Sequence, residues 1–494
     1  MSCNTWRHAV TFLECGALSP LFSSGGQYTK RGVPWDLVQS GDKAPRSKTT
    51  EAHDMFQHPR RDFLKQSGLT AAATAAWSLS PAAGRAAGAN ERLIAAVIGP
   101  GGMGGSHLRQ LVGRQDVQVA YVCDVDANRL AAAARVVQEA TGQAPKAVKD
   151  LRQVLDDKSV DAVWIATPDH WHAPATILAC DAGKHVYVEK PCSHNLREGR
   201  LMVEAARRNN RVVQVGTQSR STEHVIQAVQ ALRDGVIGDV LVAKAWNSQR
   251  RGSIGHQPPS DPPPHLDFDL WLGPAPACQY RANMLHSIWR WWYDFGAGDI
   301  GNDGVHDIDL ARWGLGVDVQ PNTIAALGGK YFFDDDQQWP DTQYVVFEYA
   351  GDGQKTKTKQ LIFEQRIWSP YFQEGHENGN AFYGTKGVMI LGKQTGWKVT
   401  LEGNKPGPTG TGTFSLPRHH QNFLDCIRSG ARPNADIEIG HLTASLCHLA
   451  NIATRVGRVL RFDPQTEQIA DDPEAAKLLR REYRPGHWAV PKGV

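Results

Sequence analysis

The chain has 494 residues, and its 54 Lys and Arg against 51 Asp and Glu leave a formal net charge of only +3. So small an excess gives no strongly basic surface, which argues against a nucleic-acid partner. Hydrophobic residues at 41% and charged residues at 21% are typical of a folded globular protein. No apolar run reaches the length of a membrane-spanning helix, so stable membrane insertion is not expected. The eight Cys lack C-x-x-C or metal-like spacing, which predicts neither a disulfide framework nor a metal site.

The sequence pattern of the first ninety residues predicts an export signal. Arg60 and Arg61 form a basic start, a mildly apolar stretch follows, and small residues end the segment near Ala89. The run RRDFLK resembles the bacterial twin-arginine (Tat) motif. The alternative is an amphipathic helix with two chance arginines. We predict a Tat signal over residues 55–89, cleavage near Ala89, contact with the Tat machinery and a periplasmic location.

Residues 1–54 precede this signal and show no periodicity. Tat signals stand at the start of a protein, so Met55 is the predicted translation start. Residues 1–54 are therefore expected to be untranslated or disordered.

A nucleotide-binding pattern begins at residue 92. Residues 92–99 are an apolar run of the kind found in a strand buried on both faces, and GPGGMG from Gly99 matches G-x-G-x-x-G. A helical pattern follows, and a second strand over 117–123 ends at Asp124. Such glycines let the backbone approach a pyrophosphate, and the acid accepts from a ribose diol. Because Asp124 would repel a 2′-phosphate, NAD is favoured over NADP. The predicted cofactor contacts here are Gly99, Gly101, Gly102, Met103, Gly104 and Asp124.

The strand–helix alternation continues to residue 218. Strands are predicted over 162–166, 185–188 and 212–215, with helices over 173–183 and 196–209. This alternation indicates a doubly wound parallel sheet, a Rossmann domain over residues 90–218. Ligands bind at the carboxyl ends of such strands. The residues predicted at that crevice are Thr167, Pro168, Glu189, Lys190 and Gln218.

The pattern changes after residue 218. Strand-like runs at 323–326, 343–349, 359–363 and 387–391, with helices over 418–429 and 439–456, predict a second α/β domain over residues 219–464. Residues 465–494 are predicted to form a tail on the surface.

Four motifs together resemble the Gfo/Idh/MocA family, named for glucose-fructose oxidoreductase, inositol dehydrogenase and rhizopine catabolism. They are GPGGMG from Gly99, ATPDHWH ending at His172, EKP around Lys190, and GDIGNDGVHDID ending at Asp309. The resemblance implies a Rossmann domain followed by an α/β domain with an open, mainly antiparallel sheet. In this family that sheet usually joins a second subunit, so a homo-oligomer, dimer or tetramer, is expected. It also implies that Lys190 lies near the nicotinamide and substrate, that His306 is the acid/base, and that His172 lines the nicotinamide pocket.

The chemistry of Lys190 and His306 suits these roles. A lysine fixed by the proline that follows it can donate to a substrate oxygen and stabilise negative charge as hydride leaves. His306 lies in the first turn of a helix predicted over 304–313, where the helix dipole favours a neutral imidazole that can accept a proton. The alternatives are a surface lysine and a buried, hydrogen-bonded histidine. Many family members have Asp where Asn302 stands, and Asn can orient the ring but cannot stabilise imidazolium. Asp309, three residues after His306, is a possible replacement.

The aromatic run WRWWY from Trp289 to Tyr293 precedes this segment. Aromatic rings suit the apolar faces of a sugar, and they equally suit a core or interface cluster. We therefore expect an NAD-dependent oxidoreductase acting on a secondary alcohol of a sugar, polyol or glycoside. Because NAD is made in the cytoplasm, an exported enzyme must hold its cofactor tightly. Two alternatives stay open: an NAD-dependent glycosidase that uses transient oxidation and elimination, and a nucleotide-bound sugar sensor.

Overall fold

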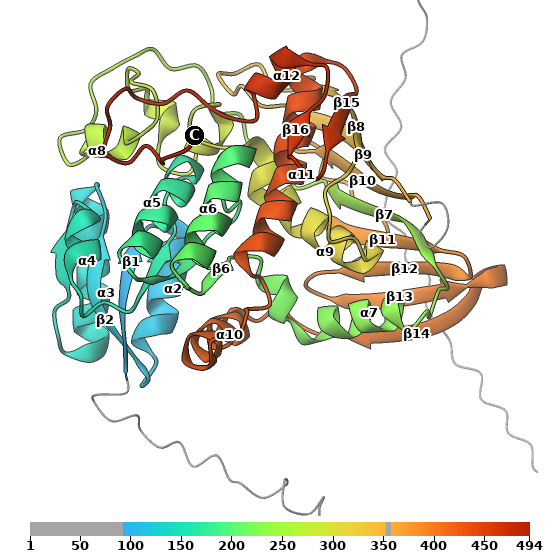
Figure 1. Ribbon diagram of the computed structural model, residues 1–494, viewed down its shortest axis with the longest axis horizontal. Helices are drawn as coiled ribbons and strands as arrows, with labels where there is room; N and C mark the ends of the chain where they lie inside the picture. The colour runs from blue at the N-terminus through green and yellow to red at the C-terminus, as the bar shows by residue number, and fades with distance from the viewer. Residues whose placement is uncertain (1–91, 352–356) are drawn as a thin grey trace, which may run out of the picture. The chain divides into compact units, whose positions relative to one another are not determined.

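The parallel sheet predicted for the first half of the chain is present. A computed structural model describes residues 92–351 and 357–494 (Figure 1), so the predicted export signal, Met55 and Ala89 lie outside the described residues. Six strands, all parallel, follow the order β3-β2-β1-β4-β5-β6. Their bounds are β1 Leu93–Ile98, β2 Val117–Cys123, β3 Lys146–Val148, β4 Ala162–Ile165, β5 His185–Val188 and β6 Val213–Val215. The doubly wound order places the carboxyl ends of the strands at one edge.

Five helices connect these strands, and two of them begin with a side-chain N-cap. They are α2 Gly102–Val112, α3 Ala127–Thr141, α4 Arg152–Asp156, α5 Asp169–Asp181 and α6 Leu196–Arg208. The Asp126 carboxylate caps α3 by accepting from the backbone N–H of Asn128 at 2.8 Å. Helix α5 begins four residues before its predicted start at 173 and includes Pro174. Proline has no N–H, so the His170 carbonyl lacks its helical donor. The guanidinium of Arg481 donates to that oxygen instead, at 2.8 Å.

The second sheet is mixed and mainly antiparallel, as expected. Among the described residues it has ten strands in the order β14-β13-β12-β11-β7-β10-β9-β8-β15-β16, and only β7 and β10 pair in parallel. The bounds are β7 Val240–Asn247, β8 Thr323–Gly329, β9 Thr342–Tyr349, β10 Lys359–Arg366, β11 Asn378–Gly384, β12 Gly387–Gly392, β13 Gly396–Leu401, β14 Lys405–Thr411, β15 Leu460–Asp463 and β16 Gln468–Ile469. All four predicted strands lie within these elements.

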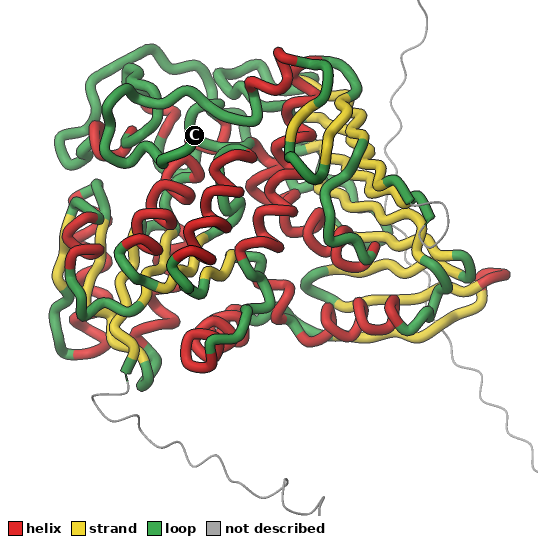
Figure 2. The backbone as a smooth tube through the Cα atoms, in the orientation of Figure 1, coloured by secondary structure: helices red, strands yellow, loops and turns green. Residues whose placement is uncertain are grey.

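Helices pack between the two sheets, as Figure 2 shows in red. Helix α9, Val305–Leu315, packs on β7 and β11, and α11, Ile437–Val456, packs on α6 and β8. The remaining helices are α7 Glu223–Arg233, α8 Phe268–Leu272, α10 Leu416–Ser429 and α12 Pro473–Lys477. No helix in the described part of the chain has both the length and the apolar character to cross a membrane.

The boundary predicted at residue 218 does not separate two independent cores. Phe423 and Leu424 of α10 are fully buried in the same cluster as Val97 of β1 and Leu108 of α2. Residues after 218 thus complete the first core, and residues 92–494 lie in one compact unit. The end of the chain is also more than a surface tail, since Ala489 is 2% exposed and packs into the core beside the parallel sheet.

Candidate active site

A deep cleft opens at the carboxyl ends of the parallel strands. Its empty volume, open solvent included, is about 1290 Å³. Of the predicted site residues, Gly99, Gly101, Gly102, Met103, Asp124, Thr167, Pro168, His172, Glu189, Lys190 and Asn302 line the cleft. Gly104, Gln218, His306 and Asp309 do not. The cleft therefore gathers most of the predicted residues and separates four from them.

The glycine turn is shaped for a phosphate group. Gly99 has φ +78, and a Cβ on it would meet the Ala166 carbonyl oxygen at 2.8 Å. A Cβ on Gly104 would overlap the carbonyl oxygen of Gly99, so this glycine keeps helix and strand close rather than contacting a ligand. Helix α2 starts at Gly102 and has no side-chain cap. Its first N–H groups are thus free to bind a pyrophosphate, and the residues fit a dinucleotide.

Asp124 lies directly after β2 and lines the cleft. Its Oδ1 accepts from the backbone N–H of Asp126 at 2.9 Å. Burial raises the pKa of Asp124 to about 6, while Arg129 opposes that shift. The carboxyl group is therefore mainly ionised at neutral pH and can accept from a ribose diol. Thr167 adds a buried hydroxyl that has no protein partner among the described residues.

Lys190 is held in the cleft by the backbone of Asn302. The Lys190 Nζ donates to the Asn302 carbonyl oxygen, and burial lowers the pKa of this ammonium. The Asn302 amide donates to Oδ1 of Asp299 at 2.9 Å. The expectation that the Asn302 side chain orients His306 is therefore not met; this residue positions Lys190 instead.

His306 is half-buried and does not line the cleft. Burial, followed by the charges of Lys190 and Lys393, lowers its pKa to about 3, so the imidazole is neutral at physiological pH. Burial and neighbouring charges thus keep His306 neutral, whereas the sequence predicted that the helix dipole would do so. A π-helical turn, Ile300–Gly304, runs directly into α9, and the helical segment already begins at Gly298. His306 therefore lies two turns inside a helix rather than at its free N-terminus.

Asp309 contacts a different partner from the one expected. Its carboxylate accepts from Nε and Nη2 of Arg220 at 2.7 and 2.9 Å and from the Thr443 hydroxyl at 2.8 Å. Asp309 is 1% exposed and Arg220 5% exposed. The pair is a buried ion pair that joins α9 to the crossover after β6, so Asp309 does not supply the carboxylate for His306.

Glu189 is the centre of a buried polar chain. Its Oε1 accepts from Gln218 Nε2 at 3.0 Å and from His107 Nε2 at 2.9 Å, and His107 Nδ1 lies 2.8 Å from His420 Nε2. Burial opposes ionisation of Glu189, but the bond from His107 and nearby cations lower its pKa to about 2. Gln218 therefore holds Glu189 and does not face the cleft. His420 was not a sequence candidate, because 313 residues separate it from His107.

His172 lies between two carbonyl oxygens, those of Thr167 at 2.8 Å and Pro191 at 2.7 Å. Burial lowers its pKa, and a neutral ring can donate to only one of these oxygens. This geometry suits a residue that shapes the floor of the cleft.

Further residues line the cleft besides the predicted site residues, and one of them, Asp169, belongs to the ATPDHWH motif. Asp169 is 2% exposed, accepts from the Ala297 N–H at 3.2 Å, and has its pKa raised to about 7 by burial. Arg290 lines the cleft with a buried Nε that lacks a partner among the described residues. Of the four rings in the aromatic run only Trp289 lines the cleft, whereas Trp291 is buried and Trp292 donates to Asn283. The cluster interpretation thus holds for Trp291, and Trp289 is the ring of this run that faces the cleft.

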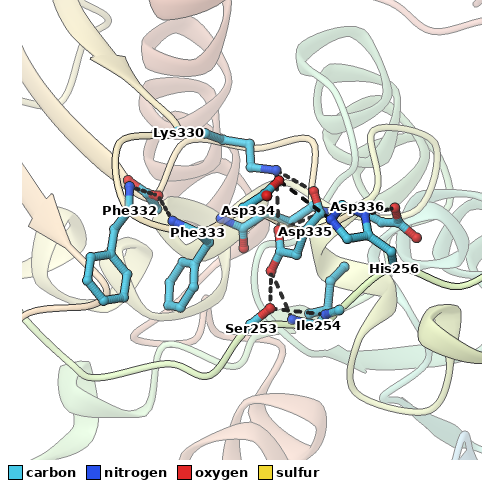
Figure 3. Close-up of polar contacts among 12 residues, drawn as sticks. Ser253, Ile254, His256, Lys330, Phe332, Phe333, Asp334, Asp335 and Asp336 are labelled. Atoms are coloured by element: carbon cyan, nitrogen blue, oxygen red, sulfur yellow. Dashed lines mark hydrogen bonds and ion pairs between the residues drawn. The ribbon is translucent and has the colours of Figure 1, made fainter.

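The segment that carries Trp289 and Arg290 is bonded to the loop between β8 and β9, where the Gln338 N–H donates to the Trp291 carbonyl at 2.9 Å. Figure 3 shows Asp335 accepting from the Ser253 hydroxyl at 3.1 Å and from the Ile254 N–H at 2.9 Å, and His256 paired with Asp336 at 2.8 Å. Asp336 also accepts from Asn283 at 2.9 Å. These bonds join the loop after β7 and the turn at Asn283 to the loop between β8 and β9. Within the described ranges no group of three or more His, Cys, Asp or Glu is placed to hold a metal ion.

Comparisons with known proteins agree with this geometry. Residues 93–217 match the oxidoreductase family's NAD-binding Rossmann fold, and residues 240–353 and 413–490 match its C-terminal alpha/beta domain. Inositol 2-dehydrogenase of Rubrobacter xylanophilus is 26% identical over 310 residues, covering 61% of this chain and 72% of that protein. A glycosyl hydrolase family 109 protein of Stenotrophomonas maltophilia is 31% identical over 254 residues, covering 48% and 52%.

Among solved structures, levoglucosan dehydrogenase in complex with NADH and levoglucosan matches with a TM-score of 0.57 and 19% identity, covering 75% of this chain and 99% of that one. This likeness supports the fold. The two family matches span most of the described residues and include the glycine turn, Lys190 and His306. The chain therefore belongs to the Gfo/Idh/MocA family of NAD(P)-dependent oxidoreductases.

Proposed function

We propose that the protein oxidises a secondary alcohol of a sugar, polyol or glycoside by hydride transfer to NAD. The observation that carries this proposal is one cleft with the glycine turn and Asp124 in one part and Lys190, held by Asn302, in another. Asp124 favours NAD over NADP because a second negative charge at the ribose would be repelled. Relatives that act on inositol and levoglucosan support a polyhydroxylated substrate.

The charge state of each residue determines its role in this reaction. Bound NAD would take the hydride from the carbon that carries the hydroxyl. The Lys190 ammonium donates to that hydroxyl oxygen and stabilises the negative charge that develops on it. His306, neutral because its pKa is lowered to about 3, does not line the cleft and would accept the hydroxyl proton through one water. Asn302 is a positioning residue that acts through Lys190.

A panel of sugars, polyols and glycosides tests this proposal. The purified full-length protein is mixed with each compound, and the absorbance of reduced nicotinamide is followed. We expect reduction with at least one polyhydroxylated compound, and loss of that reduction in Lys190→Met. A panel with no reduction in protein shown to bind NADH would overturn the proposal.

We also propose export by the Tat route and retention of the cofactor in place. Arg60 and Arg61 support export, and a folded protein delivered outside the cytoplasm has no supply of fresh NAD. Cell fractionation of wild type and of the Arg60→Lys/Arg61→Lys variant tests export. Nicotinamide at a stoichiometric level after purification supports retention; protein that is empty and needs added NAD contradicts it.

The glycosidase alternative is favoured by the similarity to the family 109 protein. In that chemistry, oxidation at one ring carbon acidifies the neighbouring C–H, the aglycone leaves, water adds, and hydride returns. An aryl glycoside assay in D₂O separates the two reactions, because only elimination releases aglycone together with deuterium at the neighbouring carbon. The sensor alternative requires ligand binding without reduction, and it is excluded if Lys190→Met abolishes a measured turnover.

A homo-oligomer is the proposed assembly. The second sheet leaves large apolar side chains exposed, among them Leu327 of β8 at 76%, Tyr344 of β9 at 43% and Tyr383 of β11 at 43%. Burial of such side chains against a second copy would be favourable. Light scattering with size-exclusion chromatography tests it, and Leu327→Asp should shift the molar mass toward the monomer.

A further inference from the structure

The C-terminal tail, residues 479–494, is anchored across the Rossmann helices by Arg481. Its guanidinium donates to the His170 carbonyl of α5 at 2.8 Å and pairs with Glu198 of α6 at 2.7 Å. The Glu198 side chain is fully buried. The His170 oxygen is the one that Pro174 leaves without a helical donor. The sequence of α5 therefore contains the docking point for a segment that follows it by about three hundred residues.

Further contacts fasten the tail on both sides of its last aromatic residue. The Arg484 N–H donates to the Pro274 carbonyl at 2.9 Å, and its guanidinium pairs with Asp269 at 2.6 Å. On the other side Ala489 is 2% exposed and packs into the core beside the parallel sheet. Trp488 lies between these anchors, so its position is set by buried and paired neighbours.

Trp488 lines the cofactor cleft. The guanidinium carbon of Arg152, the first residue of α4, lies 4.4 Å from the centroid of its ring, and the Trp171 ring lies 5.8 Å away. Helix α4 follows β3, the neighbour of β2, and Asp124 follows β2. In a Rossmann fold the acid after β2 binds the adenosine ribose. Trp488 is therefore placed at the adenosine end of the cleft.

We propose that Trp488 is a cofactor-binding residue whose indole stacks on the adenine base of NAD. The proposal rests on the proposed use of NAD. Arg152 lies over the indole and the His487 ring centroid lies 5.2 Å from it, so the base uses the part of the indole that lines the cleft. A purine that stacks on an indole is shielded from water on that side. Because the tail already fixes the indole, binding costs little conformational entropy for this side chain. Trp488 then governs how long the cofactor stays bound.

Binding measurements on the full-length protein test this role without substrate. Dissociation constants are measured for NADH, for ADP-ribose, which has only the adenosine half and pyrophosphate, and for reduced nicotinamide mononucleotide, which has only the nicotinamide half. Trp488→Ala should weaken NADH and ADP-ribose by about 5- to 150-fold, the range for loss of one base–aromatic stack. Nicotinamide mononucleotide should bind as it does to wild type.

Two more variants complete the test. Trp488→Phe keeps an aromatic face and should restore most of the affinity for NADH. Trp368→Ala removes a tryptophan that stacks on Phe332 of the loop between β8 and β9, and it should leave all three constants unchanged.

Three results would overturn the proposal. If Trp488→Ala binds NADH with unchanged affinity, the indole contributes nothing to cofactor binding. If the affinities for all three ligands fall equally, Trp488 is a structural residue. Wild-type protein that binds no NADH after any copurified nicotinamide has been removed would instead remove the proposed function, and this inference with it.

Discussion

Asp309→Ala separates a structural from a catalytic role for this residue. The substitution leaves Arg220, which is 5% exposed, without its carboxylate. Removing one partner of a buried ion pair costs about 3–5 kcal/mol, because the remaining charge is uncompensated. The unfolding entropy is about 2.1 cal/mol/K per residue, or ~0.85 kcal/mol/K over roughly 400 folded residues. The melting temperature should therefore fall by about 4–6 °C.

Differential scanning calorimetry measures this shift, and NADH titration of the same samples measures the binding site. Arg220→Met/Asp309→Leu removes both charges and should recover much of the loss, because an apolar pair leaves no charge unpaired. Glu223→Ala is the matched control, since its ion pair with Arg418 at 2.7 Å is exposed and contributes little. An Asp309→Ala protein that melts like wild type but loses turnover a hundredfold or more would refute the structural assignment (about 2.7 kcal/mol in transition-state energy).

Three further outcomes follow from the cleft. Lys190→Met should lower turnover by about 10²–10³-fold, the effect of losing one donor to a developing oxyanion, and leave NADH binding nearly unchanged; a large loss of NADH binding would contradict this role. Asp124→Ala should weaken the binding of NADH by about 10- to 150-fold, because a charged hydrogen bond is lost. It should also reduce the preference for NADH over NADPH, which fluorescence titration with both cofactors measures. Burial raises the pKa of Asp169 from 3.8 to about 7, so the folded state keeps a proton that the unfolded state releases. Wild-type stability therefore falls as pH rises from 4 to 7. The melting temperature of Asp169→Asn minus that of wild type should therefore increase between pH 5 and 7 and stay at that value at pH 8. If the two melting temperatures change with pH in parallel, the pKa of Asp169 is not raised.

The parallel sheet could be predicted from sequence because strands buried on both faces are continuous apolar runs. The predicted strands over 117–123 and 185–188 match β2 and β5 at both ends. Strand β14, by contrast, has the sequence KPGPTGT and is mostly exposed, so it shows no apolar alternation. Its pairing depends on β13, which supplies the hydrogen bonds that no local pattern reports.

The candidate site was predictable where one motif supplies both the backbone and the side chain. The glycine turn and Lys190 are such cases. His306 was correctly predicted to lie in a helix, but its distance from the helix start and the cause of its neutrality were not predicted. The π-helical turn extends the helix toward the N-terminus, and burial and Lys393 are set by tertiary packing. The partner of Asp309 was missed for the same reason: Arg220 is 89 residues away in the chain.

The position of Trp488 also orders events during synthesis. Asp124 and the glycine turn leave the ribosome long before Trp488, so a nascent chain can form the phosphate-binding turn while one wall of the cleft is still missing. The His170 carbonyl stays without its donor until Arg481 has been made and has docked. Completion of the cleft is therefore a late folding step, and a protein cut short before Arg481 would have an open site and an unsatisfied helix. Docking of the tail is thus the step that completes the cleft.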